Sequence, residues 1–294
     1  MTSLSIDSLQ EGDILLMMGD GPLSELIAWA SDGVYSHAAI VVDKGELIEA
    51  SLGGVRRYPL ARRIAEFEHF HCIDAFRTDD DHGRPFAAGD RRLVGQRAQT
   101  MLGAPYPVDQ LALLGVIMAV RGKWPAHPLA RRLVRLALDR ASPTDSPAMV
   151  CSEVVYRAWA ECAVEPQGRM APRIVEGERG TAPFPAIDWK RLFDEIGPLL
   201  GLATPGLAGP AARSANAAHA TAEALLGDGG EIPDEALEQA RQRVLARLDG
   251  QGPLRSAGAD AGFTARPNPR LVSPQDLANS PSVTLIGRLM ERAG

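Results

Sequence analysis

The chain is poor in cysteine, and its cysteines do not form a structural pattern. Among 294 residues there are only three, Cys72, Cys151 and Cys162. Three widely spaced cysteines do not make the disulfide framework of a small secreted domain, and no CxxC pair is present to bind zinc. Each cysteine is therefore expected to be either a buried packing residue or a reactive thiol. We expect no metal and no cofactor.

The chain also lacks an excess of positive charge and a long hydrophobic run. Its net charge of −6 argues against nucleic acid as the main partner. The longest apolar run, residues 111–120, is too short to span a bilayer. The first residues contain neither the basic region nor the apolar core of a signal peptide. We therefore expect a cytoplasmic protein.

Aromatic residues are scarce at 5%, whereas glycine and proline are frequent, with 29 and 22 residues. Residues 201–230 are especially rich in Ala, Gly, Pro and Thr, which is typical of a linker or an insertion with little core of its own. Residues 233–248 follow with the apolar spacing of an amphipathic helix. The sequence therefore predicts an insertion over residues 166–267 that contains this one helix.

The rest of the chain alternates short apolar runs with helical patterns. A strand-rich half surrounded by helices predicts an α+β fold with an antiparallel sheet. Strands are expected near residues 14–18, 35–42, 47–51, 55–58, 70–76 and 283–286. Helices are expected near residues 24–31, 60–67, 90–102, 108–120, 128–140 and 188–200, besides the helix that begins near residue 151.

The helix near residue 151 carries the first candidate for chemistry. A turn at Ser146-Pro147 precedes Cys151, and the apolar residues that follow recur on one helical face: Val154, Val155, Ala158, Trp159 and Cys162. At a helix start, free backbone N–H groups and the helix dipole stabilise an anion, so a thiol there is a better nucleophile. The alternative is that Cys151 is merely the first apolar residue of a core helix.

A cysteine nucleophile needs a base, and His37 is the strongest candidate. It begins a predicted strand, at the edge of a sheet. Glu49 lies on the return strand of the same hairpin and could orient the imidazole, as the third member of a Cys-His-Glu triad. The strand register remains open, because a slip of one residue turns Glu49 to the opposite face.

The remaining candidates are assigned no catalytic role. Cys162 is expected to be packing, and the other five histidines are isolated or match no metal-binding spacing: His69, His71, His82, His127 and His219. Residues 107–140 form a helical, partly basic segment that has two interpretations. It could bind to an anionic membrane surface, or it could pack on the core with its arginine face in solvent.

Several short motifs together resemble a known family. In order, they are Gly12-Asp13-Ile14-Leu15, Tyr35-Ser36-His37-Ala38-Ala39-Ile40-Val41, Ile48-Glu49-Ala50, Leu102-Gly103-Ala104-Pro105-Tyr106, Cys151-Ser152-Glu153-Val154-Val155-Tyr156 and Ser273-Pro274-Gln275-Asp276-Leu277-Ala278-Asn279-Ser280-Pro281. This set resembles the circularly permuted papain-like amidases of the YiiX/YaeF type, relatives of the NlpC-like cell-wall peptidases. The histidine strand precedes the cysteine helix, as in that permuted group.

The resemblance implies a catalytic domain formed by residues 1–165 and 268–294. It also implies Cys151 as nucleophile, His37 as base and Glu49 as the residue that orients His37. The expected activity is that of a cysteine hydrolase that forms an acyl-enzyme on a small amide or peptide, such as a cell-wall-type peptide. Two alternatives remain: a lipid acyltransferase or thioesterase at a membrane surface, and a binding module of the same fold without turnover.

Overall fold

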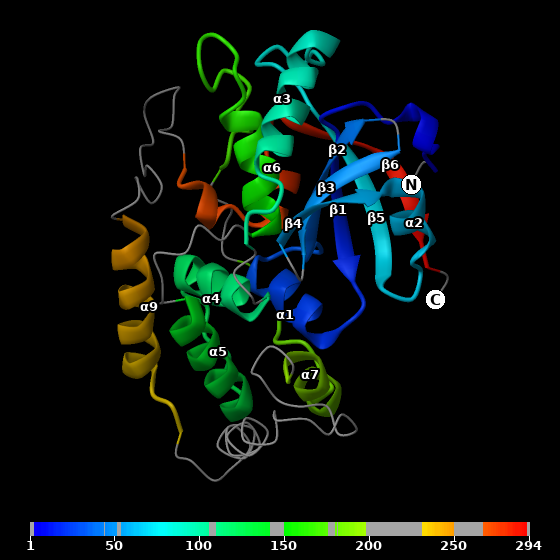
Figure 1. The fold of residues 1–294 in the computed structure, drawn as a ribbon. Coiled ribbons are helices and arrows are strands. Elements are labelled where there is room, and N and C mark those ends of the chain that lie inside the picture. The colour runs from blue at the N-terminus through cyan, green and yellow to red at the C-terminus, as the bar shows by residue number, and fades with distance from the viewer. Residues whose placement is uncertain are drawn as a thin grey trace.

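A computed structural model describes residues 3–43, 45–51, 54–105, 110–141, 150–175, 180, 182–197, 231–249 and 267–292. The predicted turn at Ser146-Pro147 and the segment 201–230 lie outside the described residues. The described strands form one six-stranded antiparallel sheet in the order β4-β3-β2-β1-β5-β6 (Figure 1). The strands are β1 (Ile14–Gly19), β2 (His37–Asp43), β3 (Glu46–Ser51), β4 (Gly54–Pro59), β5 (Phe70–Thr78) and β6 (Val283–Glu291).

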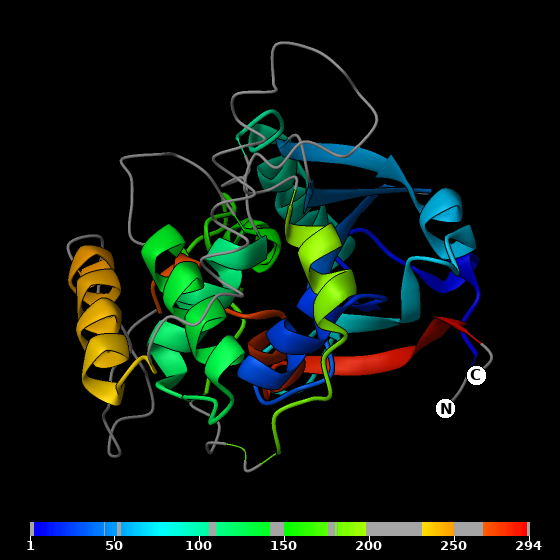
Figure 2. The same ribbon diagram turned by 90° about the horizontal axis from the view of Figure 1, so that it is seen from below.

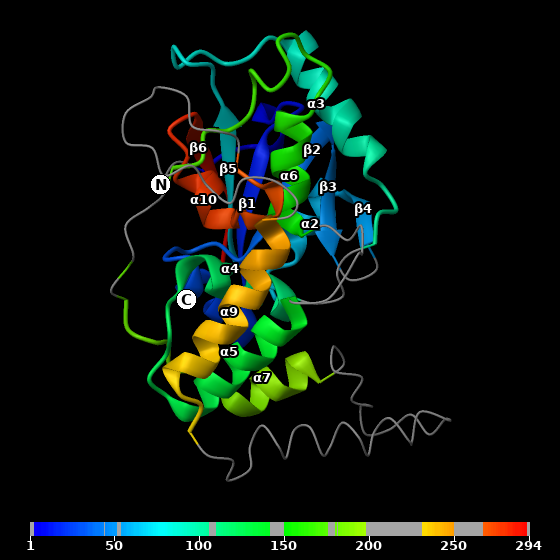
Figure 3. The ribbon, with the colours of Figure 1, turned by 90° about the vertical axis from the view of Figure 1, so that its left-hand side faces the viewer.

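Helices cover both faces of this sheet, and the predicted α+β class is confirmed. The described α-helices are α1 (Pro22–Ala30), α2 (Leu60–Ala65), α3 (Ala88–Thr100), α4 (Gln110–Arg121), α5 (Pro128–Ala141), α6 (Cys151–Ala160), α7 (Trp189–Ile196), α9 (Asp234–Asp249) and α10 (Pro274–Ala278). Two short 3₁₀ turns, Ile6–Ser8 and Pro269–Leu271, are also present. Figure 3 shows α6 lying in front of the sheet.

The apolar side chains form two clusters because β1 and β2 are buried on both faces. On one face, Ile40 and Ile48 pack with Val154 and Val155 of α6 in the large cluster. On the other face, a smaller cluster that includes Leu60 of α2 forms from the alternate residues of the same strands. Strands covered on both faces are continuously apolar rather than alternating. The sheet is therefore the layer against which the cysteine-bearing helix is fixed.

One close backbone approach fixes the depth of α6 on the sheet. The indole N–H of Trp159 donates to the carbonyl of Gly12 at 3.2 Å. Gly12 has a φ of 90°, and a Cβ there would lie 2.9 Å from the Trp159 ring. A side chain at position 12 would therefore be strained and would also push α6 away. α6 ends at Ala160, earlier than expected, so Cys162 lies just beyond it, where the thiol is buried and donates to the Trp159 carbonyl.

Helices α4, α5 and α9 pack on one another beside the sheet (Figure 2). The predicted amphipathic helix of the insertion is thus α9, and it packs against the arginine-bearing helix α5. Arg131 is buried, donates to the carbonyls of Pro125 and Ile232, and forms an ion pair with Asp234 at the start of α9. For Arg131 the alternative of a solvated face is wrong, because Asp234 of α9, Ile232 two residues before that helix, and Pro125 supply its partners.

Membrane contact by residues 107–140 stays a prediction. Within the described ranges, no helix is both long enough and apolar enough to cross a bilayer.

The chain closes on the far edge of the sheet. Residues 267–280 return to pack on α6, and β6 then pairs with β5, extending to Glu291 rather than stopping at residue 286. Within this segment, α10 begins with a capping box. There the Ser273 hydroxyl accepts from the backbone N–H of Asp276, and the Asp276 carboxylate accepts from the N–H of Ser273 at 2.9 Å. This reciprocal pair fixes the segment beside the start of α6.

Candidate active site

His37 and Glu49 lie on neighbouring strands and face each other. Ala39 pairs with Glu49 across β2 and β3, which places the side chains of His37 and Glu49 diagonally on the same face. The His37 Nε2 lies 2.9 Å from the Glu49 Oε2, and the Glu49 side chain is completely buried. The register that the sequence left open is therefore the one that brings these two residues together.

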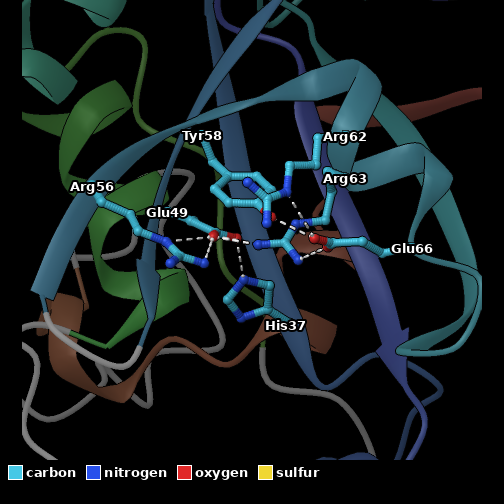
Figure 4. Close-up of polar contacts among 7 residues, drawn as sticks. All are labelled: His37, Glu49, Arg56, Tyr58, Arg62, Arg63 and Glu66. Atoms are coloured by element: carbon cyan, nitrogen blue, oxygen red, sulfur yellow. Dashed lines mark hydrogen bonds and ion pairs between the residues drawn. The ribbon is translucent and has the colours of Figure 1, made fainter.

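The second oxygen of Glu49 is held by two arginines. Arg56, paired with Glu49 across β3 and β4, donates to Oε1 from Nη2 at 2.8 Å and from Nε at 3.1 Å. Arg63 of α2 also donates to Oε1, and its guanidinium lies 4.4 Å from the centre of the Tyr58 ring. Figure 4 shows the carboxylate of Glu49 between the two guanidinium groups, with His37 on its remaining side. Both oxygens of this buried charge are thus compensated.

Sequence reasoning missed Arg56 and Arg63. The alternation of Val55, Arg56, Arg57 and Tyr58 did indicate a strand, and a strand next to Glu49 must place some residue opposite it. That signal could have found Arg56. No comparable signal exists for Arg63, because it reaches Glu49 from a helix rather than from a paired strand.

Cys151 is the first residue of α6 and is almost completely buried, at 1% exposure. Its thiol is close enough to His37 that attraction between the two groups raises the pKa of the imidazole. The backbone N–H groups of the first helical turn have no partner within the helix and point toward the same end. The Glu153 carboxylate accepts from the Val150 N–H at 3.3 Å and pairs with Arg157, which stabilises this helix start.

His37 therefore lies between groups that reach it from the two faces of the sheet. Cys151 belongs to the cluster that packs α6 on one face, whereas Glu49 is bound by Arg63 of α2 from the other face. A residue in the middle of a strand could not contact both, because its side chain points to one face only. His37 can, because it is the first residue of β2 and lies at the end of the sheet.

The charges around His37 favour its protonated form. Burial by itself lowers the pKa of His37, but attraction and hydrogen bonding to Cys151, together with the hydrogen bond to Glu49, outweigh burial and raise the pKa to about 9. Burial raises the pKa of Glu49, but His37, Arg63 and Arg56 more than reverse this and lower the pKa to about 2. The site therefore holds a carboxylate and an imidazolium at neutral pH.

The free energy of unfolding should depend on pH in a way that reflects the protonated state of His37. The His37 pKa is raised from 6.5, so its contribution is complete below pH 6.5 and is lost as the pH rises through about 9. We expect His37→Gln to lower the free energy of unfolding on the order of 3 kcal/mol at pH 6, and by much less at pH 10. Denaturant unfolding at the two pH values measures the difference. His82→Gln, in an exposed loop, is the control. An equal loss at both pH values would contradict the raised pKa.

The other histidines lie away from this site or form ordinary contacts. His71 lies 3.1 Å from Asp20, which Arg292 and Arg191 also bind, and the ring of His127 stacks on Trp189. His219 lies outside the described residues. Within the described part of the chain, no three His, Cys, Asp or Glu side chains gather in a way that could hold a metal ion.

The solved structures that match include one that is similar to nearly the whole chain. The crystal structure of the metalloprotein YiiX from Escherichia coli O157:H7 matches with a TM-score of 0.42 and 16% sequence identity, over 96% of this chain and 98% of that chain. The predicted likeness to YiiX is therefore found over nearly the whole length, and at this identity it concerns the fold alone. No protein-family model and no curated protein matches the chain.

Proposed function

We propose that this chain is a cysteine hydrolase or acyltransferase that works through an acyl-enzyme on Cys151. The observation that carries the proposal is the His37 ring, which is hydrogen-bonded to the buried carboxylate of Glu49 and whose pKa the Cys151 thiol at the start of α6 raises. A nucleophile, a base and a group that orients the base are the parts that covalent catalysis requires.

The reaction would begin with attack by the Cys151 sulfur on the carbonyl carbon of an amide, an ester or a thioester. The backbone N–H groups at the start of α6 are placed to stabilise the oxyanion that forms. Protonated His37 gives its proton to the leaving nitrogen, oxygen or sulfur as its bond to the carbonyl carbon breaks, which leaves the acyl group on the Cys151 sulfur. His37 then takes a proton from water or another acceptor, which attacks the thioester and releases free Cys151.

The second candidate is a lipid acyltransferase or thioesterase, whose acyl group is apolar. Exposed apolar side chains near His37 favour it. Three large hydrophobic side chains are exposed near the strand ends around His37: Val34 at 60%, Phe67 at 53% and Leu102 at 37%. Val34 lies in the loop before β2, and Phe67 lies in the turn before β5. Leu102 precedes Gly103, whose N–H donates to Val55 at the start of β4. Exposed apolar side chains at this end of the sheet are what a surface for an apolar ligand would use.

Acylation of Cys151 tests the proposal and separates the two candidates. The intact protein is incubated with 4-nitrophenyl acetate and with 4-nitrophenyl dodecanoate, and the adduct is located by peptide mass spectrometry. We expect one acyl group on Cys151 and none on Cys72 or Cys162, which lie away from His37. Faster acylation by the dodecanoyl ester would favour the lipid candidate. A protein that forms no adduct on Cys151 would instead be a binding module of this fold.

A further inference from the structure

The segment 272–279 contacts both halves of the candidate active site. It follows the insertion and consists of Val272, Ser273 and α10 with the next residue, Asn279. On one side it contacts the start of α6, and on the other it contacts the loop 31–36, which leads into His37. We call it the closing segment.

The contact with α6 is a single short hydrogen bond next to the nucleophile. The hydroxyl of Ser152 donates to the carbonyl of Val272 at 2.6 Å, and both residues are buried. Ser152 directly follows Cys151, so this bond fixes the first turn of the helix against the closing segment. A buried hydroxyl that loses its acceptor is left unsatisfied away from water, which keeps the bond formed.

The contact with the loop is made by Gln275. Its Oε1 accepts from the backbone N–H of Val34 at 2.9 Å, and its Nε2 donates to the Oδ1 of Asn279 at 2.8 Å. The close approach depends on Gly33, because a Cβ there would lie 2.0 Å from the Gln275 Oε1. The amide of Gln275 is thus fixed at both ends, with its oxygen on the loop three residues before His37.

A second connection joins the closing segment to the start of the same loop. Asp276 forms an ion pair with Arg121 at 3.0 Å, and the same nitrogen of Arg121 lies 3.5 Å from the carbonyl of Ser31. Asp276 and Arg121 are both buried. The loop is therefore held to the closing segment at Ser31 and at Val34.

His37 needs such support because it lies at the end of its strand. It pairs with Met17 of β1, but in the described residues the pairing of β2 with β3 begins only at Ala39. The backbone of His37 is therefore held by the ladder on one side only. The geometry points to Ser152 and Gln275 as positioning residues, which fix the Cys151 sulfur against the His37 ring through the closing segment. This inference rests on the proposed function.

Alkylation of Cys151 by iodoacetamide at pH 6.5 tests the inference, because the thiolate reacts and His37 stabilises it. We expect the rate constant for Cys151 to fall about 10- to 100-fold in Ser152→Ala and in Gln275→Met, as for a misplacement of about 1 Å. Gly33→Ala should have a similar effect, because it displaces Gln275 without touching the dyad. Gln275→Glu keeps an acceptor for Val34 and should recover most of the rate.

Ser280→Ala is the matched control. Ser280 is a buried serine just beyond the closing segment, but its hydroxyl contacts Ser282 rather than α6 or the loop. We expect the rate constant for alkylation of Cys151 in Ser280→Ala to lie within about two-fold of the wild-type value, because the two sites share no partner. Thermal melting shows that each variant is folded at the assay temperature.

The possible failures are distinguishable. If wild-type Cys151 reacts no faster at pH 6.5 than Cys72 and Cys162, the proposed function is wrong. If wild-type Cys151 does react faster, and folded Ser152→Ala and Gln275→Met react as fast, the proposed function stands and the positioning role is wrong. Loss of rate in Gln275→Met without recovery in Gln275→Glu would also overturn the role assigned to the Gln275 oxygen.

Discussion

Replacement of Cys151 by serine is expected to lower the rate of acyl-enzyme formation by at least about 10³-fold, with the protein remaining folded. The hydroxyl is smaller than the thiol and would occupy the same place at the start of α6, next to His37. A serine hydroxyl is a far weaker acid than a thiol, so a protonated imidazole cannot hold it as an alkoxide at neutral pH. Burst release of nitrophenolate from 4-nitrophenyl acetate measures the rate.

Cys162→Ser is the matched control for this experiment. Cys162 is equally buried and lies just beyond the same helix, but it is hydrogen-bonded to the Trp159 carbonyl rather than to an imidazole. Burial raises the pKa of the Cys162 thiol, so at neutral pH that thiol should be a poor nucleophile. We expect wild-type burst kinetics from Cys162→Ser. A burst that disappeared in Cys162→Ser and persisted in Cys151→Ser would show that Cys162, not Cys151, is the nucleophile.

The sequence predicted what depends on local periodicity. The apolar spacing after Cys151 indicated a helix, and α6 begins at that residue. The pattern after His37 indicated a strand, and β2 begins there. Each of these features is decided within a few residues, because helical and strand periodicities differ by almost a factor of two. The end of α6 at Ala160 was less predictable, since the apolar pattern continues through Cys162.

The sequence could not fix what depends on pairing between distant segments. Glu49 faces His37 only because Ala39 pairs with Glu49, and a slip of one residue would have turned it away. Arg63 reaches Glu49 from α2, and Gln275 reaches Val34 across 241 residues of sequence. Such contacts follow from the packing of whole elements, which no local spacing encodes. All three proposed triad members could thus be placed on their elements, whereas the face of the strand to which Glu49 points could not.

The insertion is a second case in which local spacing predicts a helix but not what packs against it. Its helix α9 was predicted by periodicity, but for the arginine-bearing face of α5 the sequence offered only solvent or a membrane surface. Arg131 is apolar along its stem and needs acceptors only at its head, so the same residue suits solvent or a buried contact. The carbonyl of Ile232 and the carboxylate of Asp234 supply those acceptors. The sequence of α5 alone could not distinguish the two environments.

Replacement of Glu49 should have the second large effect, and its two forms separate charge from packing. Glu49→Ala leaves Arg56, Arg63 and the protonated His37 without their shared anion, so we expect a loss of about 3–5 kcal/mol in the free energy of unfolding. Glu49→Gln keeps the shape and one acceptor. We expect it to fold better than Glu49→Ala, and to lower the acylation rate of Cys151 about 10²- to 10⁴-fold because His37 is no longer held as an imidazolium.

The stability difference between wild type and Glu49→Gln should depend on pH with a definite sign. The pKa of Glu49 is lowered from 4.5 to about 2, so its contribution is complete above pH 4.5 and is lost as the pH falls through about 2. Denaturant unfolding of both proteins at pH 6 and at pH 2.5 should therefore show the difference shrinking at the lower pH. An unchanged difference would mean that Glu49 is not the anion that the surrounding cations stabilise.

Asp13→Asn is the control that separates loss of function from loss of stability. Asp13 is a buried carboxylate beside the same sheet, and Arg77 binds it from Nε at 2.8 Å and from Nη2 at 2.6 Å. It precedes β1, whose pairing places Ile14 opposite Ile40 and the His37 end of β2 opposite Met17. We expect Asp13→Asn to lower stability as Glu49→Gln does but to acylate Cys151 at the wild-type rate. Equal acylation rates in the two variants would show that Glu49 holds the fold together without orienting His37.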